Sequence, residues 1–118
     1  MPLLQINLTI SDMPKEILEQ IHKLGAKILA EQLGKSIEYV MVIVRTGESI
    51  SFALEAKTPA AYIEVKNVGK LGKDLTREIT CKITDLIYEK LGVPASRTYI
   101  EFQESERHLW GWNGKTFG

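Results

Sequence analysis

The sequence predicts an α+β fold. Two βαβ(β) repeats form a four-stranded sheet that is covered by two antiparallel helices. Three observations support this prediction: two segments have helical periodicity, their flanking segments have strand patterns, and the order strand, helix, strand occurs twice with an offset of 58 residues. The 118 residues are expected to form one domain with an internal pseudo-repeat of roughly 2–57 and 58–118.

The first half of the chain carries a strand, a long helix and a second strand. Residues 3–9 alternate apolar and polar side chains, as a strand with one buried face does. After turn residues at 11–14, apolar residues recur at spacings of three and four, which indicates an amphipathic helix. It should end at Leu33-Gly34, because glycine adopts the left-handed C-cap conformation. Residues 39–44 are apolar and largely β-branched, which favours a strand.

The second half repeats this order. We expect, in sequence, a short edge strand at 50–52, a loop at Thr58-Pro59, a strand at 61–65, a helix that opens at Gly69 and Gly72 and ends at Leu91-Gly92, a strand at 99–102, and a short tail at 109–118. The helices cover only one face of the sheet, whereas the strand at 39–44 is apolar on both. The open face is therefore expected to be apolar and to be covered by other subunits.

Composition excludes several classes of function. Lys plus Arg and Asp plus Glu are both 15, so a basic nucleic-acid platform is not expected. No apolar run approaches the ~20 residues that span a membrane, and no secretory signal is recognised, which favours a cytoplasmic location. The single cysteine, Cys81, excludes a disulfide within the chain and a multi-thiolate zinc site, and we expect it in the core. No metal site or cofactor motif is predicted, since Gly69–Gly72 lacks the spacing of a phosphate loop.

One candidate for chemistry stands at the start of the chain. If Met1 is removed, Pro2 becomes a free secondary amine at the head of a buried strand. The reference pKa of an α-amino group is about 8, and burial lowers it because the charged form loses hydration. A neutral amine near physiological pH is a competent general base. Taken alone, however, Pro2 is better interpreted as a residue that only begins a strand.

Further segments give this proline a context. Met1-Pro2 is followed, in order, by Leu33-Gly34-Lys35 with Tyr39-Val40, Asn67-Val68-Gly69-Lys70-Leu71-Gly72, Arg97-Thr98-Tyr99-Ile100 and Gly111-Trp112-Asn113-Gly114-Lys115-Thr116-Phe117. In this order and at this length, the segments resemble the tautomerase superfamily, in particular the family of macrophage migration inhibitory factor and D-dopachrome tautomerase. The resemblance covers essentially the whole chain.

The resemblance implies a homotrimer with active sites at subunit interfaces. It also implies cofactor-free keto–enol tautomerisation of phenylpyruvate-like α-keto acids with Pro2 as the general base, and it is compatible with D-dopachrome tautomerase activity. Lys35 would bind the substrate carboxylate, Val68 would offer a backbone N–H, and Tyr99 would come from the neighbouring subunit. The aromatic rim and walls would be Tyr39, Trp110, Trp112 and Phe117.

The chain departs from the family pattern at three places. Ala60-Ala61-Tyr62-Ile63 stands where macrophage migration inhibitory factor has Cys-Ala-Leu-Cys, so no thiol–disulfide activity is expected. Glu101 replaces a pocket asparagine, and a carboxylate there would raise the pKa of the Pro2 amine and repel an acidic substrate. Trp110 is bulkier than the usual residue and would narrow the mouth of the pocket.

Two other functions remain open at the level of sequence. The first is a cytokine-like signalling protein that binds a receptor and keeps a vestigial pocket; it would need unconventional secretion. The second is dehalogenation or decarboxylation on the same proline, which would require further acids or arginines in the pocket; apart from Glu101, none is evident from the sequence.

Overall fold

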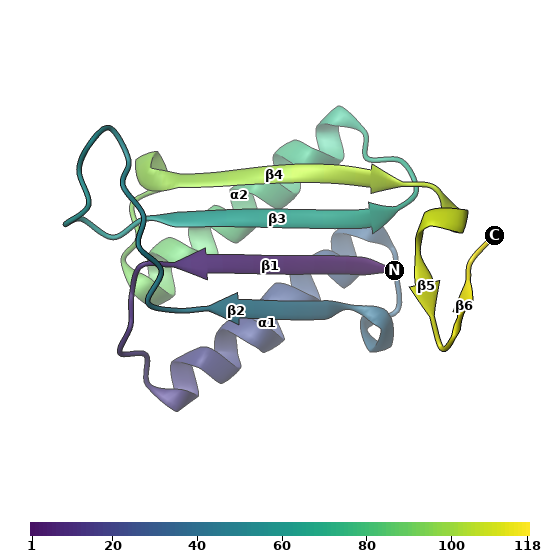
Figure 1. Ribbon diagram of the computed structural model, residues 1–118, viewed down its shortest axis with the longest axis horizontal. Helices are drawn as coiled ribbons and strands as arrows, with labels where there is room; N and C mark the ends of the chain where they lie inside the picture. The colour runs from purple at the N-terminus through teal and green to yellow at the C-terminus, as the bar shows by residue number, and fades with distance from the viewer.

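The computed structural model describes residues 1–118 and has two layers, a four-stranded sheet and two helices that cover one of its faces (Figure 1). The strands of the sheet are β1 (Pro2–Leu8), β2 (Met41–Arg45), β3 (Ala61–Val68) and β4 (Thr98–Ser105), and the helices are α1 (Lys15–Leu33) and α2 (Lys73–Leu91). Short 3₁₀ turns η1 (Ile37–Tyr39), η2 (Ala95–Arg97) and η3 (Arg107–Leu109) precede β2, β4 and the terminal ribbon of β5 (Gly111–Trp112) and β6 (Lys115–Thr116).

The sheet has the order β2-β1-β3-β4. β1 pairs with β2 and β3 pairs with β4 in parallel, while the central pair, β1 with β3, is antiparallel. The two helices begin at Lys15 and Lys73, 58 residues apart, and each has 19 residues. The predicted α+β class, with two βαβ repeats in one sheet under two helices, is confirmed.

The core lies between the sheet and the helices. In β1 and β3 every second residue is buried, and Leu4, Ile6 and Ile63 are completely inaccessible. Burying one such side chain contributes roughly 1.5–3 kcal/mol. Helix α1 approaches β1 so closely that a Cβ atom at Gly25 would lie 2.8 Å from Leu4 Cδ2, so a larger residue there would displace the buried Leu4 side chain.

Both helices end as their sequences predict. Gly34 and Gly92 adopt left-handed backbone conformations, with φ of 63° and 70°. Their N–H groups donate to the carbonyls of Ala30 and Tyr88, which closes the last turn of each helix. Neither helix has the length and apolar character that crossing a membrane requires.

Several local predictions are wrong. Tyr39 belongs to η1, and the strand begins two residues later, at Met41. Residues 50–52 form no strand; only an isolated bridge joins Phe52 to Glu55 across a tight turn. Cys81 is exposed, because the core side of α2 is formed by Ile79, Ile83, Leu86 and Ile87 instead.

The open face of the sheet is not the apolar surface that the sequence suggested. It carries the alternate residues of each strand, and on the three strands β1, β3 and β4 most of these are polar. They are Leu3, Gln5 and Asn7 on β1, Tyr62, Glu64, Lys66 and Val68 on β3, and Tyr99, Glu101, Gln103 and Ser105 on β4. Only the short strand β2 places Met41 and Ile43 there. The prediction of an apolar open face is therefore wrong, because it extended the pattern of this one strand to the whole sheet.

The turn at residues 52–55 carries a conformational cost. Phe52 and Glu55 exchange two backbone hydrogen bonds, and the central residues, Ala53 and Leu54, have positive φ angles of 53° and 65°. Hairpin turns of this kind favour Asn-Gly, which the terminal ribbon has at Asn113-Gly114. A residue with a Cβ atom costs roughly 1–2 kcal/mol in this region. Leu54 is fully exposed, so its side chain offsets none of that cost.

We therefore expect Leu54→Gly to stabilise the chain. Relief of the left-handed strain exceeds the extra backbone entropy of glycine, about 0.5–1 kcal/mol, and leaves a gain of up to about 1 kcal/mol in the free energy of unfolding. Urea denaturation measures it. The control is Leu109→Gly: Leu109 is also exposed but has no positive φ, so its replacement should not stabilise. A loss of stability in Leu54→Gly would contradict the argument.

Candidate active site

A depression of about 480 Å³ opens at the amino-terminal end of β1. Its walls come from three parts of the chain: Met1 with Pro2 at the start of β1, Tyr39 of η1 with Met41 of β2, and Trp110, which follows η3, with Trp112 of β5. Figure 1 shows why these segments meet, since the N-terminus lies beside β5. The structure thus brings together Pro2, Tyr39, Trp110 and Trp112 of the residues that the sequence singled out.

Aromatic side chains form one wall of this depression. The Tyr39 and Trp112 rings meet edge to face, with centroids 5.6 Å apart. Phe117, which the sequence also placed in the wall, does not line the depression. Its ring instead stacks nearly parallel to that of Trp112, with centroids 6.4 Å apart. The Asn113-Gly114 turn folds the ribbon back, and the Phe117 N–H donates to the Trp110 carbonyl over 3.1 Å. An apolar wall of this kind suits an aryl ring.

Lys35 and Val68 lie on the other side of the N-terminus. The chain leaves α1 through the left-handed Gly34, and Lys35 Nζ then donates to the Val68 carbonyl over 3.2 Å. The Val68 N–H donates to the Met1 carbonyl over 3.4 Å. A cation and a backbone donor therefore adjoin the first residues of β1, although neither belongs to the lining of the depression.

The electrostatics favour a neutral terminal amine. Burial, and to a lesser extent the positive charge of Lys35, hold the pKa of the Met1 amine below its usual value of 8.0. With Met1 in place, the Pro2 nitrogen is an amide and cannot accept a proton. Pro2, the next residue, is fully buried at the start of β1.

Two predicted site residues, Tyr99 and Glu101, are remote from Pro2 of the same chain. Pro2 pairs with Asn67, whereas Glu101 pairs with Glu64, three residues along β3 and one strand further across. These offsets correspond to about 10 Å along and about 10 Å across the sheet. Tyr99 lies two residues further along, at the end of the sheet opposite the N-terminus (Figure 1). One chain therefore brings together only part of the predicted set.

Glu101 has a partner that the sequence did not suggest. The Tyr62 hydroxyl lies 3.0 Å from Glu64 Oε2 and 3.1 Å from Glu101 Oε1, and both carboxylates can accept from it. Burial, followed by these two hydrogen bonds, raises the pKa of Tyr62 to about 12. Two departures from the family pattern, at 60–63 and at 101, are thus in direct contact.

Sequence reasoning missed several residues of the depression and its surroundings, among them Leu3 and Val40. Glu38 and Met41 line the depression, and only their proximity in sequence to Tyr39 could have indicated them. Asn67 is 3% exposed and lies directly opposite Pro2, and its side-chain oxygen has no hydrogen-bond partner. The sequence could have indicated Asn67 by its place next to Val68, at the end of a strand with alternating side chains.

Taken together, the two-layer α+β sandwich and an apolar depression at its amino-terminal proline define the class of protein that the tautomerase superfamily represents. Comparisons with known proteins agree. A family model described as Macrophage migration inhibitory factor (MIF) matches residues 1–118. The macrophage migration inhibitory factor homolog of Trichinella spiralis is 33% identical over 99% of this chain and 100% of its own length. The factor of Xenopus tropicalis is 29% identical, over 94% and 92%.

Solved structures show the same relationship. The crystal structure of the macrophage migration inhibitory factor homologue from Prochlorococcus marinus superimposes with a TM-score of 0.89 at 36% identity and covers 98% of this chain and 99% of its own. The factor from Trichinella spiralis gives a TM-score of 0.85 at 29% identity, with 98% and 99% coverage. The chain belongs to the macrophage migration inhibitory factor family, a family of the tautomerase superfamily.

The position of Lys35 predicts a change in the titration of the terminal amine. Replacing Lys35 by Gln removes a positive charge that disfavours the protonated amine, so the pKa of the amine should rise and its neutral fraction at pH 7 should fall. The pH dependence of amine acylation measures this pKa. Lys27→Gln, on the exposed side of α1, is the control and should leave it unchanged. An unchanged pKa in Lys35→Gln would contradict the proximity of the two groups.

Proposed function

We propose that this chain is a cofactor-free keto–enol tautomerase of phenylpyruvate-like α-keto acids, with Pro2 as the general base after removal of Met1. One observation carries the proposal. The first residues of β1 enter a depression with an aromatic wall, and Lys35 and Val68 adjoin them. The membership of the chain in the family supports the same chemistry.

Each group has a chemical role in this proposal. The neutral Pro2 amine removes the proton next to the substrate carbonyl, and it returns a proton at the other end of the enol system. Lys35 attracts the carboxylate, and the Tyr39–Trp112 wall accommodates the aryl ring. The Val68 N–H is a donor for a substrate oxygen. This N–H is bound to the Met1 carbonyl in the unprocessed chain, so removal of Met1 frees both the base and the donor.

The remaining site residues require a second copy of the chain. Tyr99 and Glu101 lie far from Pro2 of their own chain, so they reach such a site only from a neighbour. Exposed apolar side chains occur at both ends of the sheet, with Met41 and Trp112 at one end and Tyr99 at the other. A head-to-tail contact between unlike ends forms a ring when its rotation closes. Three copies form that ring in the assembly implied by the family resemblance.

Glu101 would tune such a site. In the ring, the carboxylate of a neighbouring copy meets the amine and the acidic substrate, so it favours the protonated amine and weakens substrate binding. Tyr62 fixes this carboxylate by its hydroxyl group. The substrate preference of this chain, including any activity toward D-dopachrome, then depends on a contact between β3 and β4. Receptor binding with a vestigial pocket remains the alternative function; it predicts that loss of Pro2 leaves signalling intact.

The central experiment compares three proteins with phenylpyruvate. Relative to the processed chain, processed Pro2→Gly should lose turnover by on the order of 10² yet still bind, because the ring of the base is lost while Lys35 and the Val68 N–H remain. A chain that retains Met1, obtained with a methionine aminopeptidase inhibitor and verified by N-terminal sequencing, should lose turnover and binding together. Substrate quenching of tryptophan fluorescence reports binding. Full turnover by the Met1-bearing chain would exclude Pro2 as the base.

A second experiment tests whether the site is shared between copies. Pro2→Gly and Tyr99→Ala should each be nearly inactive, but unfolding and refolding them as a mixture should restore part of the activity. Mixed assemblies contain sites with an intact Pro2 from one copy and an intact Tyr99 from another. Sedimentation should show a species of three times 13.3 kDa. A mixture no more active than its components would place both residues in one chain's site, or exclude Tyr99 from it.

A further inference from the structure

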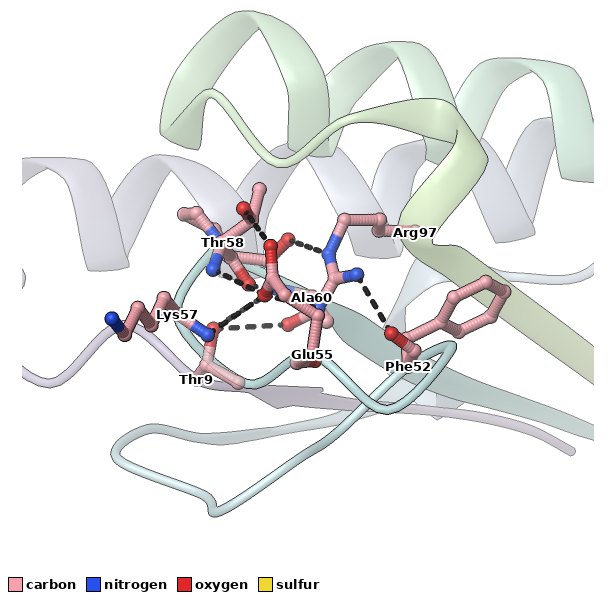
Figure 2. A network of polar contacts seen from close by, with 8 residues as sticks. Thr9, Phe52, Glu55, Lys57, Thr58, Ala60 and Arg97 are labelled. Atoms are coloured by element: carbon pink, nitrogen blue, oxygen red, sulfur yellow. Dashed lines mark hydrogen bonds and ion pairs between the residues drawn. The ribbon is translucent and has the colours of Figure 1, made fainter.

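Arg97 is the most highly connected side chain outside the depression. It ends η2, two residues before Tyr99, and its side chain is only 11% exposed. The guanidinium donates four hydrogen bonds to backbone carbonyls of a single loop. Nη1 donates to Phe52 over 3.1 Å, Nη2 donates to Glu55 over 2.9 Å and to Thr58 over 3.2 Å, and Nε donates to Pro59 over 3.2 Å. Figure 2 shows this group of contacts.

The same guanidinium also holds the loop through its side chains. Nη2 of Arg97 lies 3.4 Å from Glu55 Oε2, and the guanidinium carbon lies 5.6 Å from the centroid of the Phe52 ring. Glu55 accepts from the N–H groups of Lys57 and Thr58 over 2.7 and 2.8 Å. The loop thereby keeps the two positive φ angles at residues 53 and 54. Strained backbone of this kind persists where surrounding contacts over-determine it.

The restrained loop ends on a residue of the proposed site. The Phe52 ring contacts the Tyr99 ring edge to face, with centroids 5.1 Å apart and an interplanar angle of 68°. Tyr99 is 65% exposed, so few other contacts restrict its ring. We propose that Arg97 is a positioning residue for Tyr99: it fixes the 52–55 turn, and Phe52 in that turn sets the direction of the Tyr99 hydroxyl. This inference rests on the proposed function, in which Tyr99 enters the site of a neighbouring copy.

Arginine suits this role better than lysine. Its guanidinium has five N–H donors in a fixed plane, and four hydrogen bonds to carbonyls use most of them. An ammonium group has three donors at a single point and cannot reach the same set of carbonyls. Arg97→Lys therefore keeps the charge but releases part of the turn. Phe52→Leu keeps an apolar side chain but removes the ring that Tyr99 contacts.

A double-mutant cycle with Tyr99→Phe tests the proposal, because that variant keeps the ring and removes only the hydroxyl. In the wild-type background, Phe52→Leu and Arg97→Lys should each lower kcat/KM for phenylpyruvate about tenfold or more, since small misplacements of a reacting group are costly. In the Tyr99→Phe background the same changes should matter less than about twofold. Phe52→Tyr, which keeps a ring, should retain near wild-type kcat/KM.

Thr58→Val is the matched control. It removes a contact to Glu55 in the same loop but leaves the Arg97 bond to the Phe52 carbonyl, so any effect should be equal in both backgrounds.

Equal effects of Phe52→Leu in the two backgrounds would overturn the positioning role while leaving the proposed function intact. An unaltered kcat/KM in Tyr99→Phe would do the same. Absence of phenylpyruvate turnover in the processed wild type would overturn the proposed function, and this inference with it. If Arg97→Lys fails to fold, the cycle with Phe52→Leu decides alone.

Discussion

The pairing register of the central strands, β1 and β3, determines the geometry of the site. Leu4 and Ile6 lie opposite Val65 and Ile63, and all four side chains point under the helices. Because side chains alternate between faces, a slip by one residue would move this entire apolar set to the open face. The same register places Pro2 opposite Asn67. The packing of the core therefore fixes the first residues of the chain beside Val68, many residues away in sequence.

This register also divides the proposed site. The residues near the N-terminus gather at one end of the sheet, while Tyr99, the second residue of β4, lies at the other end. Side chains on the open face are mostly polar, so covering an apolar surface cannot be the reason for assembly. The apolar side chains that a neighbouring copy would cover lie instead at the ends of the sheet, where Trp112 and Tyr99 are exposed and where the depression lacks part of the predicted site residues.

Much of the fold could be predicted from the sequence because local rules agreed with tertiary packing. Gly34 and Gly92 ended the helices as expected, and alternation identified β1. The errors have physical reasons. The apolar–polar–apolar pattern of residues 50–52 favours a strand, but the segment enters a turn that depends on Arg97, 45 residues from Phe52 in sequence. The Asn113-Gly114 signal of a hairpin was present but was not used. Contacts such as Tyr62 with Glu101 depend on the parallel pairing of β3 and β4, which periodicity does not show.

Lys35 has two effects in the proposed reaction, and they act in sequence. Together with burial, which is the larger cause, its charge lowers the pKa of the terminal amine, so a free site holds more of the neutral base. The substrate carboxylate that Lys35 attracts then compensates this charge. Lys35 then lowers the pKa of the amine less, so the amine is a stronger base when the substrate proton lies beside it. A cation near the amine that also binds the substrate therefore favours the neutral base before binding and permits a stronger base afterwards.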